Sequence, residues 1–160
     1  MHTPIVKPGQ ALFTLLIALT LHATPALAQQ MSPPPDFIIT SRSSRGFDET
    51  IEGLKTAIES ENLMVVTEIN PQQMLRMVGV RTGGMRQLLF FHPRYMKQLI
   101  ETNRNGAIEP PLKLVVMEMP DGSVMVRYVN PNYLFGRYEG LEDLGTELSE
   151  VVQRIAASVQ

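Results

Sequence analysis

The chain has 160 residues, a formal net charge of −2 and no cysteine. The absence of cysteine excludes disulfide scaffolds, thiolate zinc sites, cysteine nucleophiles and covalently attached c-type haem. The sequence has 14 Lys plus Arg and 16 Asp plus Glu, and its basic residues do not form a stripe. We therefore expect no binding to nucleic acid.

Residues 1–28 have the pattern of a cleavable secretory signal peptide. Lys7 lies in a weakly basic opening, the run at 11–21 is apolar, and Ala-Leu-Ala at 26–28 is typical of a cleavage site. The apolar run has about half of the roughly 20 residues that a membrane-spanning helix needs. We therefore expect cleavage after Ala28, a periplasmic or secreted location, and no integral membrane anchor in the mature protein.

A proline-rich spacer at 29–35 (QQMSPPP) follows the signal peptide, and residues 36–160 are expected to form a single domain. Local patterns predict its elements, because apolar residues recur at helical spacing and Asn-Pro pairs are typical of helix starts. In chain order these elements are a strand at 36–41, a helix along 47–58, a strand at 64–69, a short helix at 71–78, a strand at 87–91, a helix from Pro93, a hairpin at 112–129 and a helix along 141–155.

The hairpin has the clearest local signal, because Asp121-Gly122 are suited to the two central positions of a tight turn. A two-residue turn fixes which side chains share a face of the sheet. The core face predicted in this way consists of Val115, Met117, Met119, Val124, Val126 and Tyr128. The opposite face consists of Leu114, Val116, Glu118, Met125, Arg127 and Val129. Glu118 and Arg127 then become diagonal neighbours.

The order of elements predicts a two-layer α+β domain with an antiparallel sheet and helices on one face. Three segments, SSRGFDETIEGLKTAI, LLFFHP and PPLKLVVMEMPDGSVMVRY, resemble the domain of unknown function 302 family over about residues 37–139, with the C-terminal helix completing the likeness. The resemblance implies a TATA-binding-protein-like fold (strand-helix-four strands-helix) with short inserted helices, often a homodimer, and a family without an agreed enzymatic activity. The residues that match its pattern are Phe90, Pro93, Pro111, Glu118, Gly122 and Tyr128. The chain departs from the pattern at Phe91 and His92, where many relatives have a small residue and Asn.

Four residues are candidates for ligand binding. His92 is the only histidine left after cleavage; at a strand end it is either a surface or capping residue, or a general base or single soft-metal ligand. Glu118, Arg127 and Tyr128 form either a salt bridge on the sheet or a pocket, in which Arg127 holds an anionic ligand and Glu118 orients it. Arg81 and Arg86 flank a Gly-Gly bend, which is only a weak anion signal.

Met117, Met119 and Met125 cluster on the hairpin, where they either fill the core or bind Cu(I) through their thioethers. Known catalytic motifs are absent from the sequence, and no cofactor is indicated. The leading hypothesis is therefore an exported, non-enzymatic module that binds a small ligand or a protein. The alternatives are a soft-metal (copper) handling protein that uses methionines with His92, and an enzyme of unrecognised type that uses Glu118 and Tyr128.

Overall fold

The computed structural model describes residues 34–160 of the chain. The signal peptide predicted at 1–28 and most of the spacer at 29–35 lie outside the described residues. No helix of the described part is long and apolar enough to cross a membrane. The elements are β1 (Ile38–Ser43), α1 (Phe47–Ser60), β2 (Met64–Ile69), α2 (Pro71–Met77), β3 (Met85–Phe91), α3 (Pro93–Asn103), the 3₁₀ helix η1 (Arg104–Ile108), β4 (Leu112–Glu118), β5 (Val124–Val129), α4 (Pro131–Phe135) and α5 (Glu142–Ala157).

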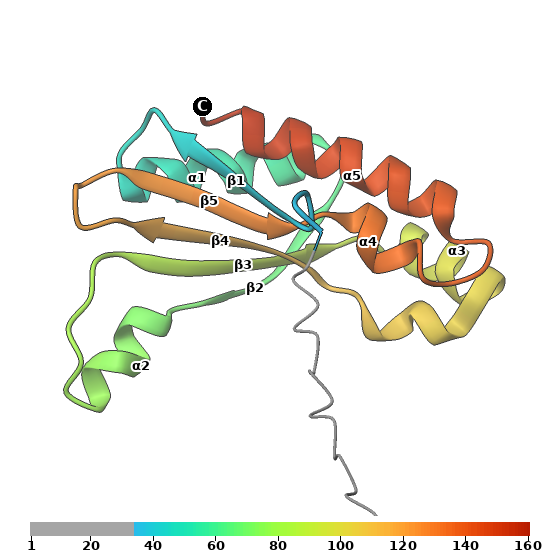
Figure 1. Ribbon diagram of the computed structural model, residues 1–160, viewed down its shortest axis with the longest axis horizontal. Helices are drawn as coiled ribbons and strands as arrows, with labels where there is room; N and C mark the ends of the chain where they lie inside the picture. The colour runs from blue at the N-terminus through green and yellow to red at the C-terminus, as the bar shows by residue number, and fades with distance from the viewer. Residues whose placement is uncertain (1–33) are drawn as a thin grey trace, which may run out of the picture. The chain divides into compact units, whose positions relative to one another are not determined.

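The five strands form one sheet in the order β1-β5-β4-β3-β2, and each strand is antiparallel to its neighbours. The long helices α1 and α5 lie on one side of this sheet, and α3 and α4 lie near one end of it (Figure 1). This arrangement confirms the two-layer α+β fold and the predicted order of strand, helix, four strands and helix. The short helices α2, α3 and α4 are the insertions.

Proline and a capping residue begin each of the three inserted helices. Asn70, His92 and Asn130 are the N-caps, and each accepts a backbone hydrogen bond through its side chain. A proline follows each cap at the first helical position, where its missing N–H would have no partner in the helix. The cap-and-proline pair therefore fixes where the chain leaves β2, β3 and β5.

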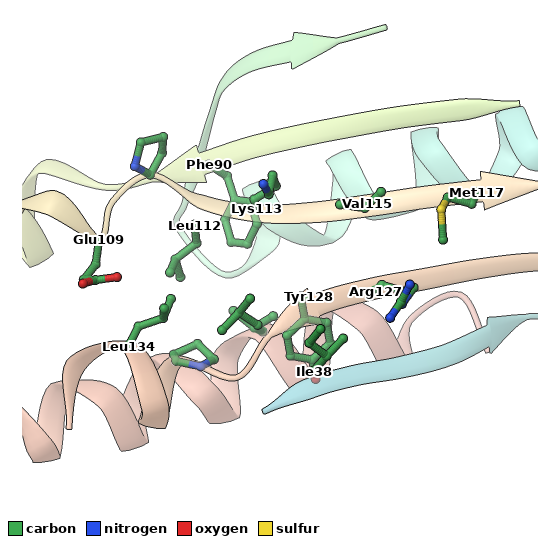
Figure 2. Close-up of a pocket in the computed structure, with 14 residues that line it drawn as sticks. Ile38, Phe90, Glu109, Leu112, Lys113, Val115, Met117, Arg127, Tyr128 and Leu134 are labelled. Atoms are coloured by element: carbon green, nitrogen blue, oxygen red, sulfur yellow. The ribbon is translucent and has the colours of Figure 1, made fainter. Parts of the chain in front are cut away.

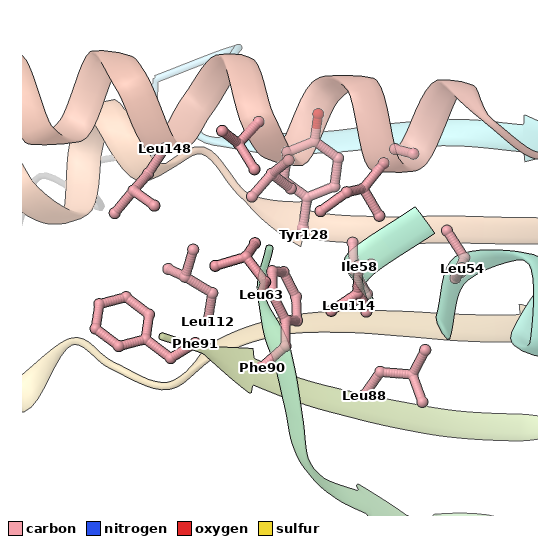
Figure 3. Packing of buried hydrophobic residues seen from close by; sticks show 14 of the residues in the cluster. Leu54, Ile58, Leu63, Leu88, Phe90, Phe91, Leu112, Leu114, Tyr128 and Leu148 are labelled. Atoms are coloured by element: carbon pink, nitrogen blue, oxygen red, sulfur yellow. The ribbon is translucent and has the colours of Figure 1, made fainter. Parts of the chain in front are cut away.

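The core lies between the sheet and the helices α1 and α5. Figure 3 shows aromatic and aliphatic side chains from both layers packed against one another. Leu54 and Ile58 of α1, Phe90 of β3 and Leu148 of α5 are fully buried. Each such side chain contributes about 1.5–3 kcal/mol of burial free energy relative to an exposed one. Burial of these side chains therefore stabilises the packing of the sheet against α1 and α5.

The β4–β5 hairpin has a register one residue away from the predicted one. The Met119 N–H donates to the Ser123 carbonyl at 2.8 Å, and Gly122 has a φ of 79°. These features describe a three-residue turn at 120–122 that ends in a left-handed glycine, instead of a two-residue turn. Val126 consequently lies opposite Val116.

The shifted register corrects the predicted faces of β4. Leu114 and Val116 are fully buried, whereas Val115 and Met117 lie on the opposite face and are only half-buried. The prediction for β5 is confirmed, since Val124, Val126 and Tyr128 are buried in the core. A one-residue slip moves every side chain of one strand to the other face, so only β4 was assigned wrongly.

Candidate functional site

The face of the sheet opposite α1 and α5 has an apolar centre. Met85, Val115, Met117 and Met125 lie there on three adjacent strands, and each is half-buried. A face that only meets water usually carries polar side chains. This uncovered face is therefore the place to look for a ligand or a partner.

A slot opens in the uncovered face where β4 and β5 part. Their ladder ends at the pair Val115 and Arg127, and the next residues of the two strands are not paired. A cavity of about 380 Å³ enters the gap, and Figure 2 shows side chains of both strands around it. Its walls come from the uncovered face, from the core and from α4, and include Ile38, Phe90, Leu112, Val115, Val129, Leu134 and Val152. The slot thus connects the surface with the edge of the hydrophobic core.

Backbone groups face the gap as well. In an antiparallel pair, every second residue exchanges hydrogen bonds with the partner strand. The bond between Met119 and Ser123 sets this phase, so that Val115 and Arg127 form a bonded pair and Lys113 and Val129 would form the next. Because the strands have parted there, the N–H and C=O groups of Lys113 and Val129 point into the slot, and within residues 34–160 they have no partner in the β4–β5 ladder.

The mouth of the slot carries a net positive charge. Lys113 and Arg127 line it and are exposed, and within residues 34–160 neither forms a salt bridge. Glu109 also lines the slot, but Arg137 donates to its carboxylate at 2.6 Å. Tyr138 donates to the same oxygen, and this hydrogen bond raises the pKa of Tyr138. Because Arg137 neutralises Glu109, the positive charges of Lys113 and Arg127 suit an acidic group.

Of the four predicted site residues, Arg127 and Tyr128 line the slot. They approach it from opposite faces of β5, since Arg127 is exposed and Tyr128 is 6% exposed. Burial raises the pKa of Tyr128, so its phenol is neutral, and its hydroxyl points toward α5 (Figure 3). Arg127 and Tyr128 both line the slot because β4 and β5 separate there, although their side chains lie on opposite faces of β5.

Glu118 and His92 lie away from the slot. Glu118 is opposite Val124, on the other face from Arg127, and its carboxylate accepts from the Gly84 N–H at 2.9 Å. His92 caps α3, where its Nδ1 accepts from the Arg94 N–H at 3.1 Å. Both side chains thus fix local backbone geometry. Glu118 is also about 13 Å along the hairpin from the level of Tyr128, at about 3.3 Å per residue, so the two do not share one site.

Three methionines form a row across the uncovered face. Met85 is the cross-strand partner of Met117, and Met117 is the partner of Met125. Directly opposed side chains in a sheet have Cβ atoms about 5 Å apart, which brings three thioethers together. His92 lies about 23 Å along β3 from Met85 at 3.3 Å per residue. Within the described part of the chain, no group of three His, Asp or Glu side chains is placed to hold a metal.

Sequence patterns missed Lys113 and Met85. Lys113 belongs to a strand whose faces were assigned wrongly, and its place at the slot depends on where β4 and β5 part. Met85 lies before the predicted start of its strand at residue 87, whereas β3 begins at Met85. A search for cross-strand methionine pairs would have found the row only with the correct register.

Known protein families and solved structures include relatives with this fold. The family model described as the domain of unknown function DUF302 matches residues 39–160. A crystal structure titled as an uncharacterized conserved DUF302 protein from Bacillus stearothermophilus is similar, with a TM-score of 0.72 and 21% identity, covering 78% of this chain and 98% of that one. Among proteins with curated descriptions, none matches this chain.

Proposed function

Because this chain belongs to the DUF302 family of domains of unknown function, we propose a function from its own geometry: an exported, non-enzymatic module that binds a small amphipathic ligand. The ligand has an apolar body, which enters the slot between β4 and β5, and an acidic group, which meets Lys113 and Arg127. Export rests on the signal-peptide pattern at 1–28.

The slot carries this proposal, because its volume of about 380 Å³ lies within the range of roughly 300–1,000 Å³ of small-molecule sites. Such sites combine apolar walls with a few polar groups that fix orientation. Here the apolar walls come from both sides of the sheet. The polar groups are the two cations and the unpaired backbone of Lys113 and Val129, which make the site selective for an anion with an apolar tail.

The probe for this site is 8-anilinonaphthalene-1-sulfonate, which has apolar rings and an anionic sulfonate. We expect one saturable site per chain by fluorescence titration, from which decanoate displaces the probe better than decanol does. Replacing Lys113 and Arg127 together by Glu should weaken probe binding by at least about tenfold, or roughly 1.4 kcal/mol, because both cations at the mouth become repulsive.

The control for the probe experiment is Lys97→Glu with Arg104→Glu. This variant changes the net charge equally at two exposed cations of α3 and η1, outside the slot. It should bind the probe like the parent protein. Equal weakening in both double variants would mean that net charge, and not the slot, governs binding, and would overturn the proposal.

The module is also proposed to be a homodimer, joined through the arm that α2 forms with its flanking loops at 70–84. No residue of α2 is buried, and Figure 1 shows α2 extending beyond the edge of the sheet. Met77 is 82% exposed and Val78 74% exposed, with Met74 and Val80 beside them. Isologous contact between two such arms would remove this apolar surface from water, and it would leave the slot open.

Sedimentation velocity tests the dimer. Met77→Glu with Val78→Glu should convert a dimer to a monomer, because two charges would have to be buried in the contact. Ile108→Glu is the matched control, since Ile108 of η1 is 81% exposed and lies outside the arm. A protein that is monomeric at every concentration, or a dimer that both variants leave intact, contradicts an interface at the arm.

A Cu(I) site is the second candidate function, and the methionine row supports it. Thioethers are soft ligands that select Cu(I), and Met85, Met117 and Met125 are direct cross-strand neighbours. All three are half-buried on the uncovered face, so an ion can reach them. In this version of the copper hypothesis the three methionines bind the metal without His92.

A further inference from the structure

A second cavity, whose walls are more polar than those of the slot, lies between β1 and α5. Its volume is about 480 Å³. One wall is formed by four consecutive residues of β1, 39–42, and the other by Ser149, Gln153 and Ala156 of α5 with Gln160 beyond the helix. The spacings of four and three place Ser149, Gln153 and Ala156 on one face of the helix. The cavity therefore runs along the edge of a strand.

The edge of β1 presents backbone groups to this cavity up to Arg42, and just after the strand the Ser44 N–H donates to the Val159 carbonyl at 2.9 Å. β1 is the first strand of the sheet, and among residues 34–160 it pairs only with β5. The Asn130 N–H donates to the Phe37 carbonyl at 2.9 Å, which fixes the alternation of the ladder. Residues 39, 41 and 43 therefore bond to β5, and the N–H and C=O groups of Thr40 and Arg42 point outward.

The two edges of the sheet differ in how they are protected against an added strand. β2, at the other edge, has a register shift between Val65 and Thr67, and its Glu68 is held by Lys55 at 2.7 Å and Arg86 at 3.2 Å. Bulges and charges of this kind discourage pairing. The pairing of β1 with β5 is continuous over six residues, and β1 contains no proline. It is the edge that can accept another strand.

The walls of the cavity are polar and almost entirely neutral. Most of the described residues that line them have hydroxyl or amide side chains, and Arg42 is the single charged one among them. The Ser41 hydroxyl is buried and has no hydrogen-bond partner within residues 34–160. Tyr128, which is 6% exposed, lines the same cavity, and burial raises its pKa. A buried hydroxyl without a partner is costly, so Ser41 is suited to a ligand that supplies a hydrogen bond.

From these observations we propose that the cavity is a peptide-binding site, in which an extended segment of a partner protein adds to the sheet as a strand beside β1. The segment's backbone bonds to Thr40 and Arg42, as in other complexes of this type. Its neutral polar side chains on the helix side meet Ser41, Gln153 and Gln160. Among residues 34–160, Tyr128 is the one residue that lines both this site and the slot, and all the other lining residues differ.

The probe is an acetylated and amidated hexapeptide of alternating threonine and valine, added to the ¹⁵N-labelled protein. We expect shifts of the Thr40 and Arg42 amide signals and of the Gln153 side-chain amide, and slower hydrogen exchange at the two backbone amides. The same peptide with alternate backbone nitrogens methylated keeps its side chains but loses its donors, and should bind at least about tenfold more weakly.

Thr40→Pro is the informative variant of the protein. It removes an outward N–H without removing a ladder bond to β5, which an edge strand tolerates, and should abolish the shifts. Thr40→Ala keeps the N–H and should bind like the parent protein. Both variants lose the 3.3 Å contact from Arg127 to the Thr40 hydroxyl, so that contact does not separate them.

Several outcomes would overturn the peptide site. If the methylated peptide binds the parent protein as tightly as the unmethylated one, backbone pairing is not involved. This result does not depend on whether Thr40→Pro folds. Shifts confined to Lys113 and Val129 would place the peptide in the slot. Concentration-dependent protection of Thr40 and Arg42 without peptide would mean that β1 pairs with β1 of a second copy. Shifts caused equally by glucose would identify a saccharide site.

Discussion

Replacing Leu114 by alanine should lower the free energy of unfolding by about 2–5 kcal/mol, the range for large-to-small changes in protein cores. Leu114 is fully buried and lies opposite Leu88, which is also fully buried. The shortened side chain leaves a cavity that the sheet and the two helices above it cannot close. Urea unfolding followed by circular dichroism measures the change, provided that the slope of the transition is unaltered.

Val115→Ala is the matched substitution one residue along the same strand. Val115 is half-buried on the uncovered face, so its two lost methyl groups are already partly in water, and the loss should stay below about 1 kcal/mol. The reverse ranking, with Val115 costly and Leu114 mild, is the signature of a two-residue turn. That result would contradict the register of the hairpin.

The register could not be derived from the strand itself, because β4 is apolar on both faces. Leu112, Leu114 and Val116 form one alternating set, and Val115 and Met117 form the other. Lys113 and Glu118 lie one at each end of the strand and belong to different sets. The charged residues therefore do not indicate which face of β4 meets water. The turn therefore decided the prediction, and Asp-Gly fits both a two-residue turn and a three-residue turn that ends in glycine.

Elements with strong local signals were predicted well. The strand at 64–69 has the predicted bounds, and the helix after Asn70-Pro71 ends one residue early at Met77. Proline and the capping side chain fix such a start without help from the rest of the chain. The first strand was placed two residues too early, since β1 begins at Ile38, where pairing with β5 and not local composition sets its ends.

The candidate site was less accessible to sequence reasoning, because it depends on pairs of residues far apart in the chain. Arg127 and Tyr128 were selected for a pocket with Glu118, and they line a different one, to which Lys113 contributes. That slot exists because β4 and β5 separate before Asn130-Pro131 begins α4. Neither strand alone contains this information.

One Cu(I) ion per chain should be retained by the protein against a chromogenic Cu(I) chelator under anaerobic, reducing conditions, if the methionine row is a metal site. Replacing Met85, Met117 and Met125 together by leucine should abolish this retention, because leucine has no thioether. Leucine has nearly the volume of methionine, so each change should cost less than about 1.5 kcal/mol of stability. A folded triple variant is therefore expected, and circular dichroism checks it.

The matched control replaces Met64, Met74 and Met96 by leucine, which removes as many thioethers from positions outside the row. Met64 is 53% exposed and Met74 59% exposed, so a site made by any accessible methionine would weaken in the control as well. Retention lost only in the row variant identifies a site built by register. If the chelator removes copper as easily from the parent protein as from the row variant, the three methionines serve packing alone, and the slot remains the proposed site of the uncovered face.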